Sequence, residues 1–461
     1  MDAYSVSESQ ARESRGGVVL LTSAIAAALG SFLFGFDTAV ISGTTETLKS
    51  LYSLTEWEKG FTVSIGLFGT LFGTPLVGRP SDRWGRRPVL TVLSVVFIIS
   101  AIGCAFAWNW YSLLVFRFIG GLAIGGTSVV SPVYITEIAP ARRRGLLVAV
   151  SQLNIVVGIL VSYLSNFLVA AILGPEHPAV WRWMFGVAVL PSVAFLLASL
   201  AIPESPRWLI KKGNRSKAEL ILAQFGHEDP IREAAEIERS LQSERLEGHQ
   251  RLFQARYARP LLLAAMIAAF NQLDGINAVI YYTTDIFRMA GADKTSALMQ
   301  SVIVGLTNLV MTILAMGLID RVGRKSLLLV GSVTFVLSHL LTAWVFHSHA
   351  QGWIVIVALM GIVGSHAYSQ GAVVWVIINE LLPNAIRASG SAAITSLLWL
   401  LDIAVSWSFP VLAGISGASA FVFFAAMMVA QFFLVLKYLP ETKGISLEEL
   451  QKQLGAETQA Q

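Results

Sequence analysis

Four ionisable side chains stand out inside long apolar stretches of this sequence: Asp37, Arg117, Asp274 and Asp402. An ionisable group in a membrane-spanning helix costs roughly 2.5–3.5 kcal/mol on insertion scales, so each one requires a chemical reason. If the stretches are helices that rise about 1.5 Å per residue, Asp37 and Arg117 both lie about 10 Å from the same side of the membrane. We therefore expect these two side chains to pair.

An Asp–Arg pair of this kind can bind and release a proton. Arginine stays charged and favours the ionised carboxylate beside it, whereas a buried carboxylate without a partner favours the protonated acid. A movement that separates Asp37 from Arg117 would therefore load Asp37 with a proton. The alternative is a permanent ion pair that only fixes helix packing. We expect Asp274 and Asp402 to be hydrogen-bonding groups in a wet cavity rather than further proton carriers.

A second group of side chains suits a neutral ligand that carries many hydroxyl groups. Amides both donate and accept hydrogen bonds, and indole faces can cover the apolar C–H face of a sugar. The alternative is that the amides join helices to one another. Gly275 and Gly371 would break helices beside such a site, as in transporters with discontinuous helices. The members of this group, which fall deep in predicted spans, are Gln152, Asn271, Gln272, Asn277, Asn308, Trp375 and Trp399.

The elements that position these residues are membrane-spanning helices. The chain has 461 residues, of which 55% are hydrophobic and 13% charged, against roughly 25% charged in a soluble domain. Apolar runs of roughly 20 residues predict spanning helices, and the alternating segments of a membrane barrel do not occur. The twelve predicted spans are 18–41, 57–78, 88–107, 110–133, 145–172, 181–201, 260–287, 295–318, 326–346, 353–379, 388–412 and 416–438.

Three charged motifs each occur twice, in the same order. Asp82–Arg87 is repeated as Asp320–Lys325, and Pro203–Arg207 has its counterpart in Pro440–Gly444. Between them, a Glu-x-x-Pro motif is followed by an arginine seven residues after the glutamate, as Glu137 with Arg144 and again as Glu380 with Arg387. The chain is therefore expected to contain two copies of one six-helix unit, an arrangement typical of transporters.

The distribution of basic residues predicts the topology. Loops 79–87, 140–145, 320–325 and 380–387 hold eleven Arg and Lys, whereas the opposite loops and helix ends hold five. The positive-inside rule then places both termini in the cytoplasm. The predicted parts are a tail at 1–17, a bundle at 18–202, a linker with short helices at 203–259, a second bundle at 260–439 and a tail at 440–461.

The motifs resemble those of the sugar porter family within the major facilitator superfamily, over nearly the whole chain. The similarity is carried by Gly35–Gly43, Arg117–Gly121, Gln272–Asn277, the two Asp-Arg-x-Gly-Arg-Arg/Lys loops, Pro203–Leu209 and Pro440–Gly444. It implies an all-α membrane protein with twelve helices in two pseudo-symmetric six-helix bundles, alternating access, and a sugar bound between the bundles.

The resemblance also assigns roles to particular residues. Proton-driven members have an acid at the position of Asp37, so Asp37 with Arg117 corresponds to the proton couple. Family sugar contacts correspond to Phe34, Gln152, Gln272, Asn277, Asn308, Trp375 and Trp399. A cytoplasmic gate corresponds to Asp82, Arg83, Arg86, Arg87, Glu137 and Arg144 in the first half, and to Asp320, Arg321, Arg324, Glu380 and Arg387 in the second. For the gate, the alternative is charge that serves topology alone.

Several positions depart from the family pattern, so the sequence does not specify which sugar is carried. Asn271 stands where a glutamine is common, Leu398 replaces an amide, and Asp274 and Asp402 stand where small or neutral polar residues are usual. We predict a plasma-membrane symporter of a proton with a hexose, pentose or polyol, acting as a monomer without a cofactor, bound metal or nucleic acid. The alternatives are an uncoupled facilitator and a sugar sensor. An enzyme is disfavoured, because no nucleophile–base set occurs.

Overall fold

The computed structural model describes residues 3–140, 144–246, 252, 254–348, 352–445 and 449–450. The side chains of residues 3–15, 144, 243–246, 320 and 384 lie outside this description. The described residues form helices and connecting turns, without a strand. Eleven helices are long and apolar enough to cross a membrane, and a pair bent by 45° makes a twelfth span. The predicted twelve-helix, all-α membrane fold is confirmed.

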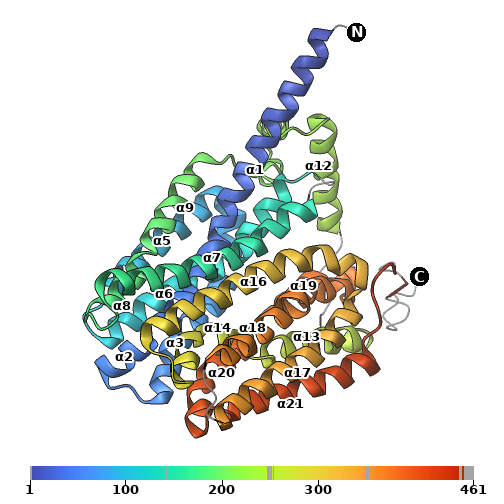
Figure 1. The fold of residues 1–461 in the computed structure, drawn as a ribbon. Coiled ribbons are helices and arrows are strands. Elements are labelled where there is room, and N and C mark those ends of the chain that lie inside the picture. The colour runs from blue at the N-terminus through green and yellow to red at the C-terminus, as the bar shows by residue number, and fades with distance from the viewer. Residues whose placement is uncertain are drawn as a thin grey trace. The chain divides into compact units, whose positions relative to one another are not determined.

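The first six spans are α1, the bent pair α3 and α4, α5, α6, α7, and α8 with α9 (Figure 1). Their bounds are Ala3–Val40, Glu56–Leu76, Gly78–Trp84, Arg86–Ala105, Trp110–Ile138, Arg144–Leu173, Val180–Gly186 and Val189–Ala201. The short helices between and after them are η1 (Ile41–Gly43), α2 (Thr45–Tyr52), α10 (Pro206–Lys211), α11 (Arg215–Gln224), α12 (Pro230–Leu246) and η2 (Ala255–Tyr257).

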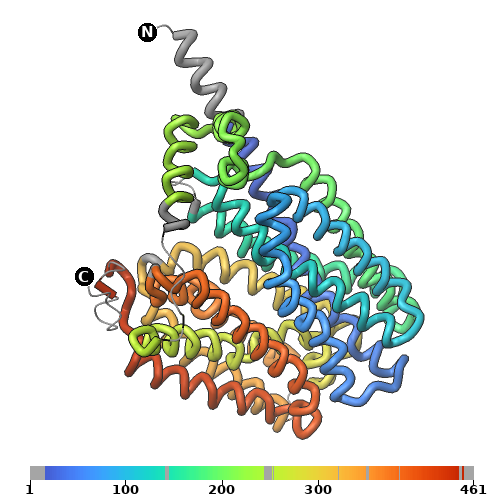
Figure 2. Tube along the Cα trace, turned by 180° about the vertical axis from the view of Figure 1, so that it is seen from behind, coloured from blue at the N-terminus to red at the C-terminus, as the bar shows by residue number. Residues whose placement is uncertain are grey.

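The last six spans are α13 with α14, α16, α17, α18 with α19, α20 and α21 (Figure 2). Their bounds are Ala258–Leu273, Ile276–Tyr281, Lys294–Val322, Arg324–Ser348, Trp353–Tyr368, Gln370–Leu381, Arg387–Ile415 and Ser419–Tyr438. Two short helices, α15 (Thr283–Met289) and η3 (Asn384–Ile386), complete the set. Within this part, α17 packs along both α18 and α21, and α13 packs along α20.

Polar residues at the helix ends explain several of these boundaries. Asn109 precedes α6 and accepts a hydrogen bond from the Ser112 backbone N–H at 2.8 Å, while the Ser112 hydroxyl accepts from the Asn109 N–H at 3.1 Å. This reciprocal capping satisfies two N–H groups that the first turn of a helix leaves free. Asp293 caps α16 in a similar way. The ends of these spans are therefore encoded locally.

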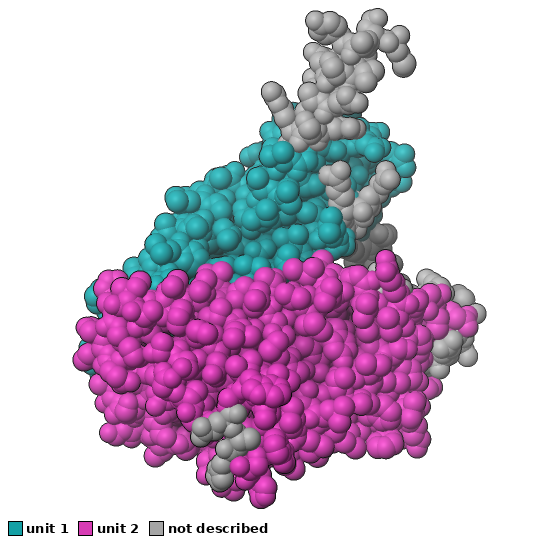
Figure 3. Space-filling model, in the orientation of Figure 1, with its two compact units in different colours: residues 1–37, 68–158, 185–248 teal, residues 38–67, 159–184, 249–461 magenta. Residues whose placement is uncertain are grey.

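The chain divides into two compact units (Figure 3). Unit 1 contains residues 1–37, 68–158 and 185–248, and unit 2 contains residues 38–67, 159–184 and 249–461. The linker helices α11 and α12 belong to unit 1, where their buried residues join the core formed by α6 and α9. The units are defined by packing, so their bounds differ from the predicted bundles at 18–202 and 260–439. The sequence-based division describes the duplication and stays a prediction.

Segments from the first half belong to unit 2 because they bond to the seventh span. The Tyr163 hydroxyl donates to the Ile280 carbonyl at 2.7 Å. The Ser42 and Thr284 hydroxyls lie 2.9 Å apart, and the Thr45 hydroxyl donates to Asp285 Oδ1 at 2.7 Å. These buried hydrogen bonds hold α7 against α14, and hold η1 and the start of α2 against α15.

Two spans of unit 2 are broken. Gly275, with φ +77°, separates α13 from α14 at the expected position, because the left-handed conformation suits glycine. The break between α18 and α19 was expected at Gly371, but it lies at Ser369, whose φ and ψ are −110° and −90°. Gly371 instead lies in the first turn of α19, where its missing Cβ leaves room for His366.

Close helix packing in unit 1 depends on glycine, and this can be tested at Gly35. A Cβ on Gly35 would lie 1.9 Å from the Ile155 carbonyl oxygen, whereas a Cβ on Gly78 would meet nothing within 4 Å. Overpacking typically costs about 1–3 kcal/mol, so Gly35→Ala should lower the thermal unfolding midpoint of the purified protein. Gly78→Ala, the matched control, should leave the midpoint unchanged or raised. Equal midpoints for the two variants would contradict this packing.

Candidate functional site

The two residues expected to pair, Asp37 and Arg117, do meet in unit 1. Arg117 Nη2 lies 3.5 Å from Asp37 Oδ2, a long distance for a charged hydrogen bond. The Arg117 side chain is 2% exposed and its guanidinium lies 5.7 Å from the centre of the Phe185 ring. The Asp37 side chain is 30% exposed. Arginine is therefore held in the core, while the carboxylate remains accessible to water.

Arg117 is incompletely satisfied in this arrangement. Its Nε and Nη1 atoms have no hydrogen-bond partner among the described residues. A buried cation with only one long contact depends strongly on the nearby carboxylate, because removal of one member leaves the other charge uncompensated. Arg117 is therefore held to Asp37 by a single long hydrogen bond.

Three of the predicted sugar-binding amides form a hydrogen-bonded chain around the break in the seventh span. The Gln272 amide donates to Asn271 Oδ1 at 3.1 Å, and the Asn277 amide donates to Gln272 Oε1 at 2.8 Å. Asn277 also donates to Asp402 on α20. The chain holds each amide in one orientation, which leaves the remaining donors and acceptors for a ligand.

The other predicted sugar contacts are placed individually. In unit 2, Asn308 on α16 and Trp399 on α20 are both 6% exposed, whereas Trp375 on α19 is 44% exposed. In unit 1, Phe34 packs against the hydrophobic core and Gln152 on α7 is half-buried. None of these five has a described hydrogen bond to the amide chain, so their role in binding a sugar stays a prediction.

Asp274 and Asp402 are both buried and hydrogen-bonded. Asp402 accepts from the Ser406 hydroxyl at 3.0 Å and is 1% exposed. Asp274 is fully buried, accepts from the Ile276 N–H at 2.9 Å, and lies 2.9 Å from His366 Nδ1. A second histidine, His339, contacts the Asp274 carbonyl oxygen at 2.9 Å. Sequence reasoning identified both acids but did not anticipate the histidine partners of Asp274.

On the predicted cytoplasmic side of unit 1, Arg86 is the centre of a charged network. Its Nε and Nη2 atoms donate to the two Glu137 oxygens at 2.9 and 2.8 Å, and Nη1 reaches Asp82 at 3.3 Å. Arg87 donates to the Leu200 carbonyl at 2.6 Å, whereas Arg83 is exposed. The forked contact matches the planar guanidinium to the carboxylate. The Arg144 side chain lies outside the described residues.

The corresponding network of unit 2 is looser. Arg324 Nη2 donates to Glu380 Oε1 at 3.4 Å, and Glu380 Oε2 has no hydrogen-bond partner among the described residues. Arg387 donates to the Leu382 carbonyl at 3.2 Å. The side chain of Arg321 is exposed, and its backbone carbonyl accepts a hydrogen bond from Lys443. The Asp320 side chain lies outside the described residues. One motif thus forms a tight ion pair in one unit and a weak one in the other.

Two glutamates that were not among the predicted site residues complete these networks. Glu204 accepts from the Arg86 backbone N–H at 2.9 Å and Glu441 accepts from the Arg324 N–H at 3.0 Å, so each caps the helix after its charged loop. The glycines before those helices, Gly85 and Gly323, have φ of +104° and +97°. A Cβ on Gly85 would lie 2.1 Å from Glu204, so the loop requires glycine there. The Pro-Glu pair recurs in both halves of the sequence, and this repeat could have indicated the role of the two glutamates.

The side of unit 2 that is predicted to face outward carries a buried ionic triad that sequence reasoning also missed. Lys59 bonds to Glu46 and lies 2.9 Å from Asp285, with only 8% of its side chain exposed. Burial opposes ionisation of Glu46, but the adjacent Lys59 charge lowers its pKa below the usual value. The sequence did contain an indication of this triad. Asp285 falls inside the predicted span 260–287, but it was not counted among the intramembrane charges.

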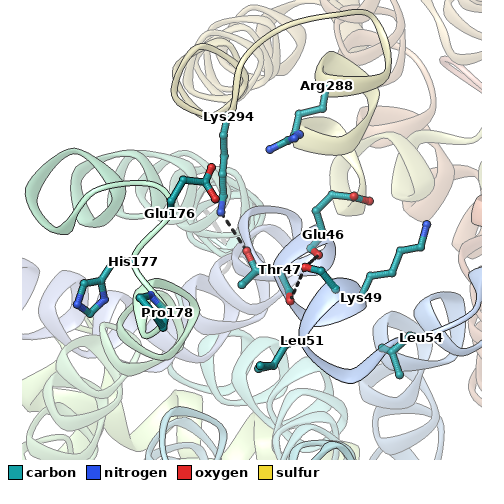
Figure 4. Close-up of a pocket in the computed structure, with 11 residues that line it drawn as sticks. Glu46, Thr47, Lys49, Leu51, Leu54, Glu176, His177, Pro178, Arg288 and Lys294 are labelled. Carbon is teal, nitrogen blue, oxygen red and sulfur yellow. Dashed lines mark hydrogen bonds between the residues drawn. The ribbon is translucent and has the colours of Figure 1, made fainter.

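A cavity of about 640 Å³ lies beside this triad (Figure 4). Lys294 points into it and donates to the Thr47 hydroxyl at 3.2 Å, and Arg288 and Glu176 face the same space. The lining includes none of the predicted sugar contacts. The cavity is therefore separate from the amide chain around Gly275. Among the described residues there is also no cluster of His, Cys, Asp and Glu that could hold a metal ion.

Comparison with known proteins gives a consistent result. Residues 23–454 match the model of a family described as "Sugar (and other) transporter". The chain is 39% identical over 435 residues to the probable metabolite transport protein CsbC of Bacillus subtilis, covering 93% of each chain. It is 37% identical over 445 residues to the arabinose-proton symporter of the same organism, covering 95% of each.

Solved structures of the Escherichia coli xylose transporter XylE have the same fold. The inward open conformation has a TM-score of 0.84 at 32% identity, and the match covers 94% of this chain and 99% of that one. XylE is described as a proton:xylose symporter of the major facilitator superfamily. The likeness extends over the full set of membrane spans, so the fold is that of the superfamily.

The unequal charged networks generate a prediction about stability. Replacing Glu137 by Gln leaves the buried Arg86 with one carboxylate contact, to Asp82 at 3.3 Å, and breaking a buried ion pair costs about 3–5 kcal/mol. The matched variant Glu380→Gln removes a single 3.4 Å contact and should cost less. Thermal unfolding of the purified variants should therefore show a lower midpoint for Glu137→Gln than for Glu380→Gln. The reverse order would show that the tight geometry does not determine stability.

Proposed function

The chain belongs to the family of sugar (and other) transporters, and we propose that it is a symporter that moves a monosaccharide or polyol into the cell together with a proton. The observation that carries the proposal is the Asp37–Arg117 pair, in which an accessible carboxylate faces a fixed, buried cation 3.5 Å away. Relatives named as arabinose-proton and D-xylose-proton symporters support the coupling and point to a pentose, and a relative named as a glucose transporter points to a hexose.

The proposed cycle depends on the single long contact between Asp37 and Arg117. Asp37 binds a proton from outside when it is apart from Arg117, because a charged carboxylate within the membrane span is costly without a counter-charge. Sugar then binds to the amide chain of Asn271, Gln272 and Asn277. After both ligands leave inward, ionised Asp37 pairs with Arg117 again, and this pairing favours the return of the empty carrier. Coupling results because the proton and the sugar each stabilise the same loaded state.

The remaining roles are proposed on the same basis. Gln152, Asn308, Trp375, Trp399, Phe34 and Gly371 complete the sugar site, and the charged networks centred on Arg86 and Arg324 hold the cytoplasmic side shut. The chain spans the membrane many times, and we place it in the plasma membrane with both termini in the cytoplasm, because basic residues gather in the loops on that side. We propose that it works as a monomer in the bilayer and binds neither nucleic acid nor a cofactor.

Proton movement with sugar is the direct test. L-arabinose, D-xylose or D-glucose is added in turn to a lightly buffered, de-energised suspension of cells that express the protein. The proposal predicts a transient rise of external pH with at least one of these sugars, because each sugar carries a proton inward. Labelled sugar that equilibrates without any pH change would instead identify an uncoupled facilitator.

The role of Asp37 is tested by Asp37→Asn, which removes the proton but keeps the shape of the side chain. Uphill accumulation should be lost, so that internal sugar only reaches the external concentration, while exchange of labelled for unlabelled sugar persists. Asp229→Asn, in the linker, is the matched control, because asparagine caps a helix as well as aspartate does, and it should accumulate normally. Continued accumulation by Asp37→Asn would exclude Asp37 as the coupling residue.

A further inference from the structure

A second set of titratable groups lies in unit 2, at the break of the seventh span. Asp274 precedes Gly275 and is completely buried, with its two carboxylate oxygens 2.9 Å from the Ile276 N–H and from His366 Nδ1. His339 from α17 bonds to the Asp274 carbonyl oxygen at 2.9 Å. Unlike Asp37, this carboxylate faces no arginine or lysine among its described partners. Its side-chain partner is instead an imidazole, a group that can gain or lose a proton.

The pair has a fixed orientation that leaves one nitrogen available. An ionised Asp274 can only accept, so His366 Nδ1 must carry the hydrogen and Nε2 must present a lone pair. The His366 side chain is 19% exposed although its partner is fully buried. A Cβ on Gly371 would lie 3.2 Å from Nε2, so glycine at that position makes room for this edge of the ring. Nε2 is thus the atom at which a proton can be gained or lost.

Protonation at Nε2 changes the charge of the buried cluster. With neutral His366 the pair carries one net negative charge, and with protonated His366 it becomes a neutral ion pair. The other titratable groups that face Asp274 are His339 from α17 and Asp402 from α20, and Asp402 interacts with Asp274 electrostatically. Two carboxylates and two imidazoles therefore lie close together in one apolar region.

The cluster is connected to the predicted sugar site through short covalent and hydrogen-bonded paths. Asp274 accepts the N–H of Ile276, the first residue of α14, and Asn277 is the second residue of that helix. Asn277 in turn bonds to Gln272 and to Asp402. A change of charge at Asp274–His366 therefore acts on the first turn of the helix that carries Asn277.

We propose that Asp274 and His366 form a second proton-binding site, and that its occupancy sets how tightly the amides around Gly275 hold a sugar. The site differs from Asp37–Arg117 in position, in unit 2 rather than unit 1, and in role, because it adjusts affinity and does not drive accumulation. Only the link to sugar rests on the proposed function. Proton binding at His366 is a property of the folded protein and is tested without transport.

Proton binding is measured by exchange of the histidine C2 hydrogen for deuterium, followed by mass spectrometry of the purified protein at a series of pH values. The proposal predicts that the exchange rate at His366 changes with pH as its ring gains a proton. In Asp274→Asn its proton affinity should fall about tenfold or more, because a neighbouring opposite charge is lost. His347, exposed near the end of α17, is the internal control and should titrate identically in both proteins. A His366 that does not titrate, or titrates alike in both proteins, overturns the proposal.

The link to sugar is measured in the Asp37→Asn background, where accumulation is already removed. The half-saturating concentration of labelled D-xylose or L-arabinose for exchange should change about fivefold or more between pH 5 and 8, the scale of a typical coupling between two sites. Adding His366→Asn should make that profile flat, and this variant also decides the matter if Asp274→Asn does not fold. A profile unchanged by His366→Asn overturns the link. Accumulation by Asp37→Asn would reject the proposed coupling residue and leave the histidine titration standing.

Discussion

In an apolar helical bundle, a charge is stable only beside an opposite charge or a set of hydrogen-bond partners. The described intramembrane charges of this protein all follow that constraint. Arg117 faces Asp37, Asp274 faces His366, and Asp402 is held by Ser406 and Asn277. Because Arg117, His366 and Asn277 each come from a different helix than the acid that they contact, the need to compensate these charges also fixes which helices lie together at the functional residues.

The same constraint allows movement when compensation is incomplete. The Arg86–Glu137 pair is forked and tight, so it behaves as a stable joint. The Asp37–Arg117 contact is single and 3.5 Å long, and Arg117 keeps two nitrogen atoms without a described partner. A transporter needs both kinds of contact. Strong ion pairs keep helices together as a unit moves, whereas protonation of a weakly bonded carboxylate can shift the population of conformations.

Broken helices provide the second requirement of the site, which is free polar groups at membrane depth. The turns at Gly275 and Ser369 interrupt the seventh and tenth spans, and the polar side chains of the site gather beside them. Backbone groups that lose their helical partners must bond elsewhere, and the Asp274 carboxylate and the His339 ring take up two of them. The breaks thus bring carboxylate, imidazole and amide groups to one place.

The sequence alone determined the class of protein, the number of spans and most of the chemistry. Apolar run length specifies a spanning helix, and repeated motifs reveal duplication, because both signals are local along the chain. The depth of Asp37 and Arg117 was enough to predict that they pair, because helical rise converts residue number into distance. The capping role of Glu204 and Glu441 could have been predicted from the sequence, because the Pro-Glu pair recurs in both halves.

Only the tertiary structure decided which side chains from distant spans meet. The partnership of Asp274 with His366, and of Lys59 with Asp285, joins residues whose spacing along the chain has no regular relation to their contact. The same holds for the break at Ser369, which was expected at Gly371, because the backbone there responds to neighbours and not to glycine content alone. Sequence specifies where charge is buried, and packing selects the group that compensates it.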